Sequence, residues 1–341
     1  MNSNRILPRW LLATISFMLL ALMIMAIPMQ PHAQGEPPKR TPKITDTPEP
    51  TISAAAKALT GNIVFLSMRS GSYEIYVTSP DGSDTRALTM DDDPAVIKWW
   101  PAISPDGTQI AYVQNSKEQP GVYDVYVMGI NGDNRQRITD LGLQIFCVDW
   151  SPDATKFALC AKHADGSDKE DIYVVNMDGT GLTKLTDDPA RDYDPEWSPD
   201  GKHIVFDSDR DLDSNLYGSV YVMNPDGTQI KQLAVGYSGS WSPDGKRIAY
   251  SGVCGYGATR KGTLCLMNAD GSDQHEVPSS SGVELEPRWS PDGKFLVITG
   301  RPARADATAN EIYVIGVDTT ERIQLTNNAV DDSQAVWGVV R

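Results

Sequence analysis

A five-residue motif that returns at a near-constant interval constrains the fold of this chain more than any other feature. Trp-Ser-Pro-Asp-Gly occurs three times in full, once with Ala in place of Gly, and once with Ile in place of Trp. With a final isolated Trp, the markers are Ile103, Trp150, Trp197, Trp241, Trp289 and Trp337, spaced by 47, 47, 44, 48 and 48 residues. A period in the forties made of short strands is typical of a β-propeller, in which each repeat forms one four-stranded blade.

Each repeat unit contains the same four predicted strands, A to D. Strand A ends at the marker, and the Pro-Asp-Gly that follows favours a tight turn because Pro presets φ and Gly tolerates positive φ. Strand B is an apolar run, such as residues 204–206. Strand C carries a column occupied by Tyr76, Tyr126, Tyr173, Tyr221, Cys265 and Tyr313, and a short strand D follows a second turn. Apolar B and C strands are expected where neighbouring blades cover both faces of a sheet.

The two ends of the repeat region complete each other. Residues 62–89 predict strands B, C and D without a strand A, whereas residues 334–341 predict a strand A, with Trp337, and nothing after it. We therefore expect an all-β fold, a six-bladed β-propeller closed by pairing of the C-terminal strand beside residues 63–66 of the N-terminal blade. Such closure removes the two exposed sheet edges that an open array would leave.

The N-terminal residues carry the pattern of an export signal. Arg5 and Arg9 precede an almost wholly apolar run at residues 10–27, which is typical of a signal peptide (residues 1–27) or of a retained membrane anchor. The positive flank predicts that the rest of the chain is extracytoplasmic, whether periplasmic, at the cell surface or secreted. Residues 28–60 are rich in Pro and Thr and lack apolar periodicity, so they predict a linker. The propeller would then occupy residues 61–341.

The charge of the chain narrows the range of partners. The net charge is −15 over 341 residues. Residues 1–60 hold six basic and three acidic side chains, so the predicted propeller alone has a net charge of −18. This balance disfavours nucleic acid and anionic lipid, and it confines membrane contact to the N-terminal segment. It favours a cationic ligand, a divalent metal or a basic protein surface, although solubility alone is an equally good explanation.

The repeat resembles that of the TolB family. The run Trp-Ser-Pro-Asp-Gly, Ile-Ala-Tyr, then Ile-Tyr-Val-Met-Asn with Asp-Gly and Leu-Thr is similar to the TolB propeller repeat over residues 61–341. The resemblance implies a six-bladed propeller that binds a partner lipoprotein at the mouth of its channel. TolB proteins carry an α/β domain ahead of the propeller, for which residues 28–60 are too short, and the same repeat precedes α/β-hydrolase domains in some peptidases. The resemblance therefore implies the fold and a binding role, and it leaves the partner open.

A candidate binding surface follows from which loops vary. The A–B and C–D turns are near-identical, whereas the B–C and D–A loops differ between units, and variation among repeats belongs on the binding face. Four residues before the markers stand four aromatic side chains, with Leu285 and Ser333 in the other two units: Trp99, Phe146, Tyr193 and Tyr237. The surrounding carboxylates are Asp91, Asp92, Asp93, Asp192, Asp194, Glu284, Glu286, Asp331 and Asp332. This pattern predicts a channel rim that holds a cation or a basic peptide segment. In the alternative interpretation, the aromatics wedge between blades and the acids cap turns.

One B–C loop contains alternating carboxylates at Asp207, Asp209, Asp211 and Asp213. Ca²⁺ takes six to eight oxygen ligands, so this loop is a candidate calcium site. It lacks the Gly at which a calcium loop turns and the Glu that would complete it. No other cofactor is predicted.

The four cysteines fall into two close pairs. Cys147 and Cys160 are equidistant from the centre of one A–B hairpin, and Cys254 and Cys265 flank one B–C loop. Of the three connectivities that four cysteines allow, only this one is local in both cases. In an exported protein we expect two disulfides, each worth roughly 3 kcal/mol by loop entropy. Two pairs of buried free thiols are the alternative.

Motifs of catalysis are missing from the sequence. It contains no Gly-x-Ser-x-Gly, no phosphate-binding loop and no His-Glu-x-x-His, and the three histidines of the predicted propeller, His163, His203 and His275, fall in three different units. We therefore predict a non-catalytic propeller that docks an envelope or cell-surface protein. The alternatives are a small-molecule or glycan sensor, which would use the aromatic ring, and a hydrolase or lyase that depends on rim carboxylates.

Overall fold

The computed structural model describes residues 59–91, 93, 95–163, 169–211, 218–254, 263–278, 284–301 and 309–339. The chain divides into two compact parts, Met1–Glu49 and Pro50–Arg341, and all described residues belong to the second. The predicted signal or anchor at residues 1–27 and nearly all of the predicted linker lie outside the described residues, as do Asp92 and Asp213. No described segment forms a helix with the length and hydropathy needed to cross a lipid bilayer.

The described residues form β-strands joined by turns and contain no helix, so the expected all-β class is confirmed. The strands are β1 (Asn62–Ser67), β2 (Glu74–Thr78), β3 (Arg86–Ala87), β4 (Lys98–Ile103), β5 (Gln109–Asn115), β6 (Tyr123–Gly129), β7 (Gln136–Arg137), β8 (Leu143–Trp150), β9 (Lys156–His163), β10 (Asp171–Asn176), β11 (Thr183–Lys184), β12 (Asp192–Trp197), β13 (Ile204–Ser208), β14 (Ser219–Met223), β15 (Lys231–Trp241), β16 (Arg247–Gly252), β17 (Thr263–Asn268), β18 (His275–Glu276), β19 (Glu284–Trp289), β20 (Phe295–Gly300), β21 (Glu311–Gly316), β22 (Arg322–Gln324) and β23 (Asp332–Gly338).

Successive strands pair antiparallel, and the pattern repeats with the period of the sequence. The strands from β4 to β7, from β8 to β11 and from β19 to β22 pair in chain order. The C-terminal strand β23 pairs with β1, which places Trp337 opposite Ile63, and β23, β1, β2 and β3 form one four-stranded sheet. Strand A is thus followed outward by strands B, C and D in every period, including the one split between the chain ends.

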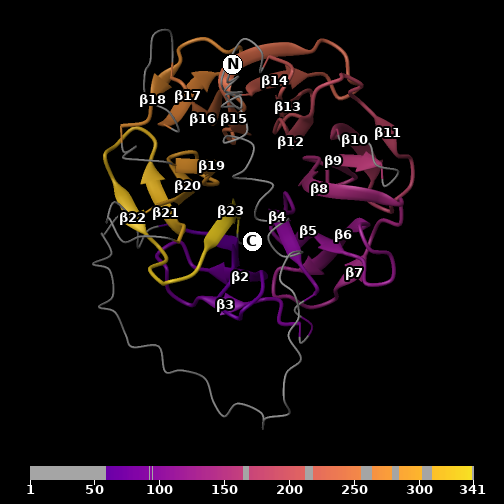
Figure 1. The fold of residues 1–341 in the computed structure, drawn as a ribbon. Helices are drawn as coiled ribbons and strands as arrows, with labels where there is room; N and C mark the ends of the chain where they lie inside the picture. The colour runs from indigo at the N-terminus through magenta and orange to yellow at the C-terminus, as the bar shows by residue number, and fades with distance from the viewer. Residues whose placement is uncertain are drawn as a thin grey trace, which may run out of the picture. The chain divides into compact units, whose positions relative to one another are not determined.

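The six strands that carry the markers lie innermost, which we call the inner strands: β4, β8, β12, β15, β19 and β23. Each inner strand contacts the next one along the chain, and β23 contacts β4. Figure 1 shows the sheets arranged side by side around a common centre, with their short outer strands at the periphery. This is the arrangement of a β-propeller.

One period departs from the expected pattern. β15 is eleven residues long, and it serves both as the outer strand beside β14 and as the inner strand beside β16. The sequence predicted a loop between strand D of one period and strand A of the next. The continuous strand needs no such loop, which accounts for the shortest marker spacing, the 44 residues between Trp197 and Trp241.

Apolar packing between neighbouring sheets holds the inner strands in place. Strands B and C are buried almost throughout: every residue of β2, β13 and β21 is buried. The marker side chains lie between sheets, and two of the marker indoles hydrogen-bond across a junction. Trp150 Nε1 donates to the carbonyl of Ala102 at 3.1 Å, and Trp289 Nε1 donates to that of Ser240 at 3.0 Å. The repeated Trp therefore joins adjacent sheets, which explains its regular spacing.

The repeated Ser-Pro-Asp-Gly turns are closed by their own side chains. In all five copies the Ser hydroxyl donates to the Asp carboxylate at 2.7 Å. In the turn after β12, the bond from Ser198 is the largest cause that lowers the pKa of Asp200, to about 2, and Gly201 takes a φ of 70°. These groups satisfy one another, so the turns serve the fold.

Both predicted disulfides are confirmed. Cys147 of β8 bonds to Cys160 of β9, with 5.1 Å between their Cα atoms, and Cys254 bonds to Cys265 of β17, with 5.3 Å. In the period of β16 and β17, the second disulfide joins the start of the B–C loop to strand C. The equivalent positions of the period of β1 and β2 hold Arg69 and Tyr76, which stack at 5.3 Å. The disulfide therefore occupies a place where another unit uses a cation–π contact.

Candidate binding site in the central cavity

The inner strands enclose a cavity of about 330 Å³, which we call the central cavity. Its wall includes the residue directly before each marker, and the six are Ala102, Asp149, Glu196, Ser240, Arg288 and Val336. Three of these six side chains, Asp149, Glu196 and Arg288, are ionisable, which is unusual for a largely buried surface. The sequence patterns alone did not mark this column as a candidate site. A variable, partly polar position beside a constant aromatic marker was the signal that could have identified it.

A β-bulge interrupts the inner strands shortly before the marker and turns further side chains toward the cavity. Three residues before the marker, five of the six units hold a non-glycine residue with positive φ: Trp100 (52°), Asp194 (50°), Ser238 (57°), Glu286 (55°) and Gln334 (52°). Such residues are uncommon, and bulges are known to re-aim side chains. Trp100, Glu286 and Gln334 accordingly line the cavity.

Side chains of the cavity wall also connect one inner strand to the next. Asp149 Oδ2 accepts from the backbone N–H of Trp197 at 2.8 Å, and Glu196 Oε1 accepts from that of Trp241 at 2.7 Å. Glu286 Oε2 accepts from the N–H of Gln334 at 3.0 Å. Each carboxylate thus has one oxygen fixed by backbone, and the wall is rigidly positioned.

One arginine lies among these carboxylates. Arg288 Nη2 is 3.0 Å from Asp194 Oδ1, and Arg288 Nε is 3.5 Å from Glu196 Oε2. Its side chain is 17% exposed, and it comes from β19, whereas both carboxylates belong to β12. Since β15 lies between those two strands in the order of the inner strands, Arg288 reaches across the cavity.

The acidic groups outnumber this cation, and burial shifts their titration. Burial raises the pKa of Asp149 to about 7 and that of Glu196 to about 8. Burial also raises the pKa of Glu286, and it raises that of Asp207 well above its usual value, with the charge of Asp194 as the next cause. Burial lowers the pKa of Arg288, but the surrounding carboxylates outweigh it and raise that pKa overall.

Three of the predicted rim carboxylates form ion pairs within the fold. Asp332, Asp192 and Glu284 open β23, β12 and β19 and are at most 1% exposed. Each pairs with an arginine: Arg69 at 2.7 Å from Asp332, Arg210 at 2.9 Å from Asp192, and Arg322 in contact with Glu284. These arginines stack on aromatic rings of strands B, C or both, at 4.2–5.6 Å. These three acids therefore stabilise the fold through ion pairs with arginines of strands or loops nearby.

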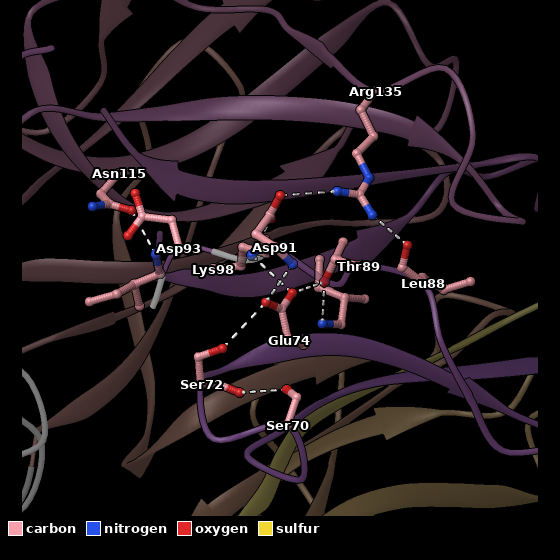
Figure 2. Close-up of polar contacts among 12 residues, drawn as sticks. Ser70, Ser72, Glu74, Leu88, Thr89, Asp91, Asp93, Lys98, Asn115 and Arg135 are labelled. Atoms are coloured by element: carbon pink, nitrogen blue, oxygen red, sulfur yellow. Dashed lines mark hydrogen bonds and ion pairs between the residues drawn. The ribbon is translucent and has the colours of Figure 1, made fainter. Parts of the chain in front are cut away.

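The corresponding position of β4 holds a cation instead, Lys98, which is completely buried. Its Nζ lies 2.9 Å from Glu74 Oε2 and 2.6 Å from Asp91 Oδ2. Figure 2 shows Lys98 between these carboxylates and shows Arg135 reaching from Asp91 to the carbonyl of Leu88, a 2.6 Å hydrogen bond. Here too, charge joins β4 to the neighbouring sheet.

Two other predicted rim acids lie at the surface or in a turn. Asp93 is half-buried and pairs with the exposed Lys117 at 3.1 Å, and a bond from the N–H of Ala95 is the main cause that lowers its pKa. Asp331 accepts from the N–H of Asn310 at 2.8 Å. Only Asp194 and Glu286 of the predicted acids belong to the group around Arg288.

The four predicted aromatics are half-buried, and they do not form one ring of like contacts. Trp99 packs edge-on against Tyr123 at 4.8 Å, and Tyr123 packs against Phe146 at 5.8 Å. Tyr193 lies under Arg191 at 5.0 Å, while Tyr237 stands on β15 opposite Ser251. A continuous aromatic strip therefore runs along β4, β6 and β8.

The alternating carboxylates that begin at Asp207 of β13 contact different partners. Asp207 is buried and accepts from the N–H of Ser238 at 2.6 Å, Asp209 accepts from Tyr193 at 3.3 Å, and Asp211 accepts from Tyr221. Across the described residues, no three His, Cys, Asp or Glu side chains come together in a group that fits a metal ion. The calcium hypothesis, which also includes Asp213, stays without geometric support.

None of the histidines lines the central cavity. His203 packs near Trp241 at 6.3 Å, His163 packs near Tyr173 at 6.5 Å, and His275 is exposed beside Asp273. The cavity therefore offers carboxylates, one guanidinium, hydroxyls, an amide and four indoles. This set is suited to binding cationic groups.

Comparison with known proteins identifies one family model, one related sequence and several solved structures that resemble this chain. Residues 52–240 match the family model described as the TolB beta propeller domain. A protein described as a TolB homolog from Chlorobium luteolum is 43% identical over 61 residues, which is 18% of this chain and 13% of that protein, so the match spans a small part of the curated relative. The crystal structure of TolB from Acinetobacter baumannii superposes with a TM-score of 0.66 at 21% identity, covering 82% of this chain and 67% of that one. A putative TolB from Agrobacterium tumefaciens gives 0.57 at 19%, covering 83% and 100%.

Proposed function

Because the chain belongs to the TolB β-propeller family, we propose that it is an extracytoplasmic binding propeller, without catalytic activity, that docks an envelope or cell-surface protein at its central cavity. The observation that supports this most is the acidic lining of the cavity, where Asp149, Glu196, Glu286 and the buried Asp194 surround one arginine. The partner surface that fits it is basic.

The architecture that we propose for this role has three parts. Residues 1–27 direct export or anchor the chain, residues 28–60 are a linker, and residues 61–341 form six blades of one closed ring. The register between β1 and β23 and the contacts that run from each inner strand to the next support the ring. Membrane contact is then limited to the N-terminal segment.

Docking at the end of the cavity where the inner strands end is favoured by charge and by aromatic surface together. The marker residues Trp241, Trp289 and Trp337 line the cavity at this end, and Trp100 also lines it. Aromatic side chains provide large contact areas at low entropic cost, and complementary charge steers the encounter. A basic segment with an apolar anchor would match both features.

Capture from the native envelope tests this function. The full chain is immobilised, and captured proteins are quantified with wild type and with the variant Asp194→Asn/Glu286→Gln, which removes two negative charges near Arg288. The matched control is Asp84→Asn/Asp273→Asn, which removes two charges from exposed turns. We expect the cavity variant to capture about tenfold less of a basic partner, and the control to leave capture unchanged. Equal capture by both variants would count against the cavity as the docking site.

A further inference from the structure

We propose that Arg288 is an internal occupant of a guanidinium-binding site in the central cavity, and that it sets how deeply a basic side chain of a partner can enter. The second clause rests on the proposed function, whereas the first concerns the cavity alone. The site consists of the carboxylates that surround the Arg288 side chain.

The contacts of Arg288 are those of a bound ligand. Its Nη2 and Nε reach two carboxylates of β12, at 3.0 Å and 3.5 Å, and its Nη1 donates to the carbonyl of Pro287 at 3.1 Å. Asp149 and Glu286 add further negative charge around it. A planar guanidinium with several donors suits such an arrangement of acceptors better than a spherical ammonium does.

The repeat indicates that the fold does not require an arginine here. The equivalent position of the other five units holds Val336, Ala102, Asp149, Glu196 or Ser240. Small apolar, hydroxyl and acidic side chains all fit this place on an inner strand. Arg288 is therefore not needed for β19 to pair with its neighbour. Its role is to occupy the cavity with a guanidinium group.

The surrounding acceptors are not saturated by this one cation. Asp194 Oδ2 and Asp207 Oδ1 have no hydrogen-bond partner among the described residues, although both side chains are about 99% buried. Buried acceptors without partners are costly, so this pocket of carboxylates has capacity for further donors. An external guanidinium would find matching acceptors once the internal one is removed.

Arg288 limits how deeply a basic side chain of a partner can be inserted into the cavity. With Arg288 in place, a basic side chain that enters past the marker residues meets a like charge before it reaches Glu286 and Asp194. Without Arg288, the same side chain can reach Asp194 and Glu196. Arg288 is thus a specificity-determining residue, because it favours shallow basic segments over deeply inserted ones.

The test uses purified full chain and N-acetyl-arginine amide, with the isosteric, uncharged citrulline amide as the control ligand. Arg288→Ala should bind the arginine amide at least about tenfold more tightly than wild type by calorimetry, and it should not bind the citrulline amide. Arg86→Ala, which removes an exposed arginine of β3, should behave as wild type. The gain should disappear in Arg288→Ala/Asp194→Asn. No gain in Arg288→Ala would overturn the proposal.

A second variant and a second measurement keep the test valid if Arg288→Ala fails to fold. Arg288→Gln keeps hydrogen-bonding capacity without charge, and its melting temperature should rise with millimolar methylguanidinium but not with sodium chloride of equal ionic strength. A melting temperature that responds equally to both salts also contradicts the proposal. Failure of the proposed function is distinguishable: in that case Arg288→Ala gains the arginine amide while wild type and the cavity variant capture the same envelope proteins.

Discussion

Raising the pH through the neutral range should destabilise the folded protein, because the cavity holds acids that are protonated in the folded state and ionised in the unfolded chain. Burial raises the pKa of Glu196 to about 8 and that of Asp149 to about 7, from ordinary values near 4. At pH values between the ordinary and the raised pKa values, the folded state binds more protons than the unfolded state. The free energy of unfolding therefore falls as pH rises, and this loss is complete above the folded pKa values.

The expected magnitude follows from the size of these shifts. A single fully shifted group changes the free energy of unfolding by up to about 1.4 kcal/mol per pH unit. Glu196 and Asp149 interact with each other and share Arg288, so they titrate as a coupled pair. Allowing for that coupling, we expect a loss of about 2 kcal/mol between pH 5.5 and pH 7.5.

Urea unfolding at pH 5.5, 6.5 and 7.5 measures this slope. Glu196→Gln should flatten it by roughly half, because the amide is neutral throughout, while it still accepts from the N–H of Trp241. Asp84→Asn, at an exposed turn, should leave the slope as in wild type. A stability that rises over this range, or an unchanged slope in Glu196→Gln, would refute the reasoning.

Two further predictions concern the stability of the ring. Cys254→Ala/Cys265→Ala should lower the free energy of unfolding by about 3 kcal/mol, the entropy of an 11-residue closure, and a urea midpoint equal to that of wild type would contradict this. Trp337→Ala should cost about 3–5 kcal/mol, because its side chain is 8% exposed and its indole donates to Thr60 O at 3.0 Å. The exposed Leu182→Ala is the control for Trp337→Ala, and equal calorimetric melting temperatures for the two variants would exclude an important role of β23 in holding the ring.

The sequence predicted those features of the fold that repeat. The markers and turns recur with one period, so a single assignment applied to every unit, and the cysteine pairs followed from counting residues across one hairpin and one loop. The register of β23 on β1 agrees with the strand that the first unit lacked. Repetition made these inferences possible because an error in one unit would have shown as a break in the others.

The features that escaped prediction depend on contacts between units. Asp332 lies 263 residues from its partner Arg69, so no local sequence pattern indicates that the two form a buried ion pair. The bulge that gives Trp100 and Glu286 positive φ has no glycine to mark it. Arg288 was missed because one unit alone carries a cation at that position. The candidate site thus moved from the outer rim to the wall of the cavity.

Site-specific photocrosslinking in the native envelope tests the central claim, docking at the cavity, most directly. A photoreactive residue at Val339, which lines the cavity directly after β23, is compared with one at Asp273, on an exposed turn. We expect a discrete adduct with one basic envelope protein from position 339, weakened by Asp194→Asn/Glu286→Gln, and none from position 273. Adducts of equal yield from both positions, or from position 273 alone, would contradict docking at the acidic cavity.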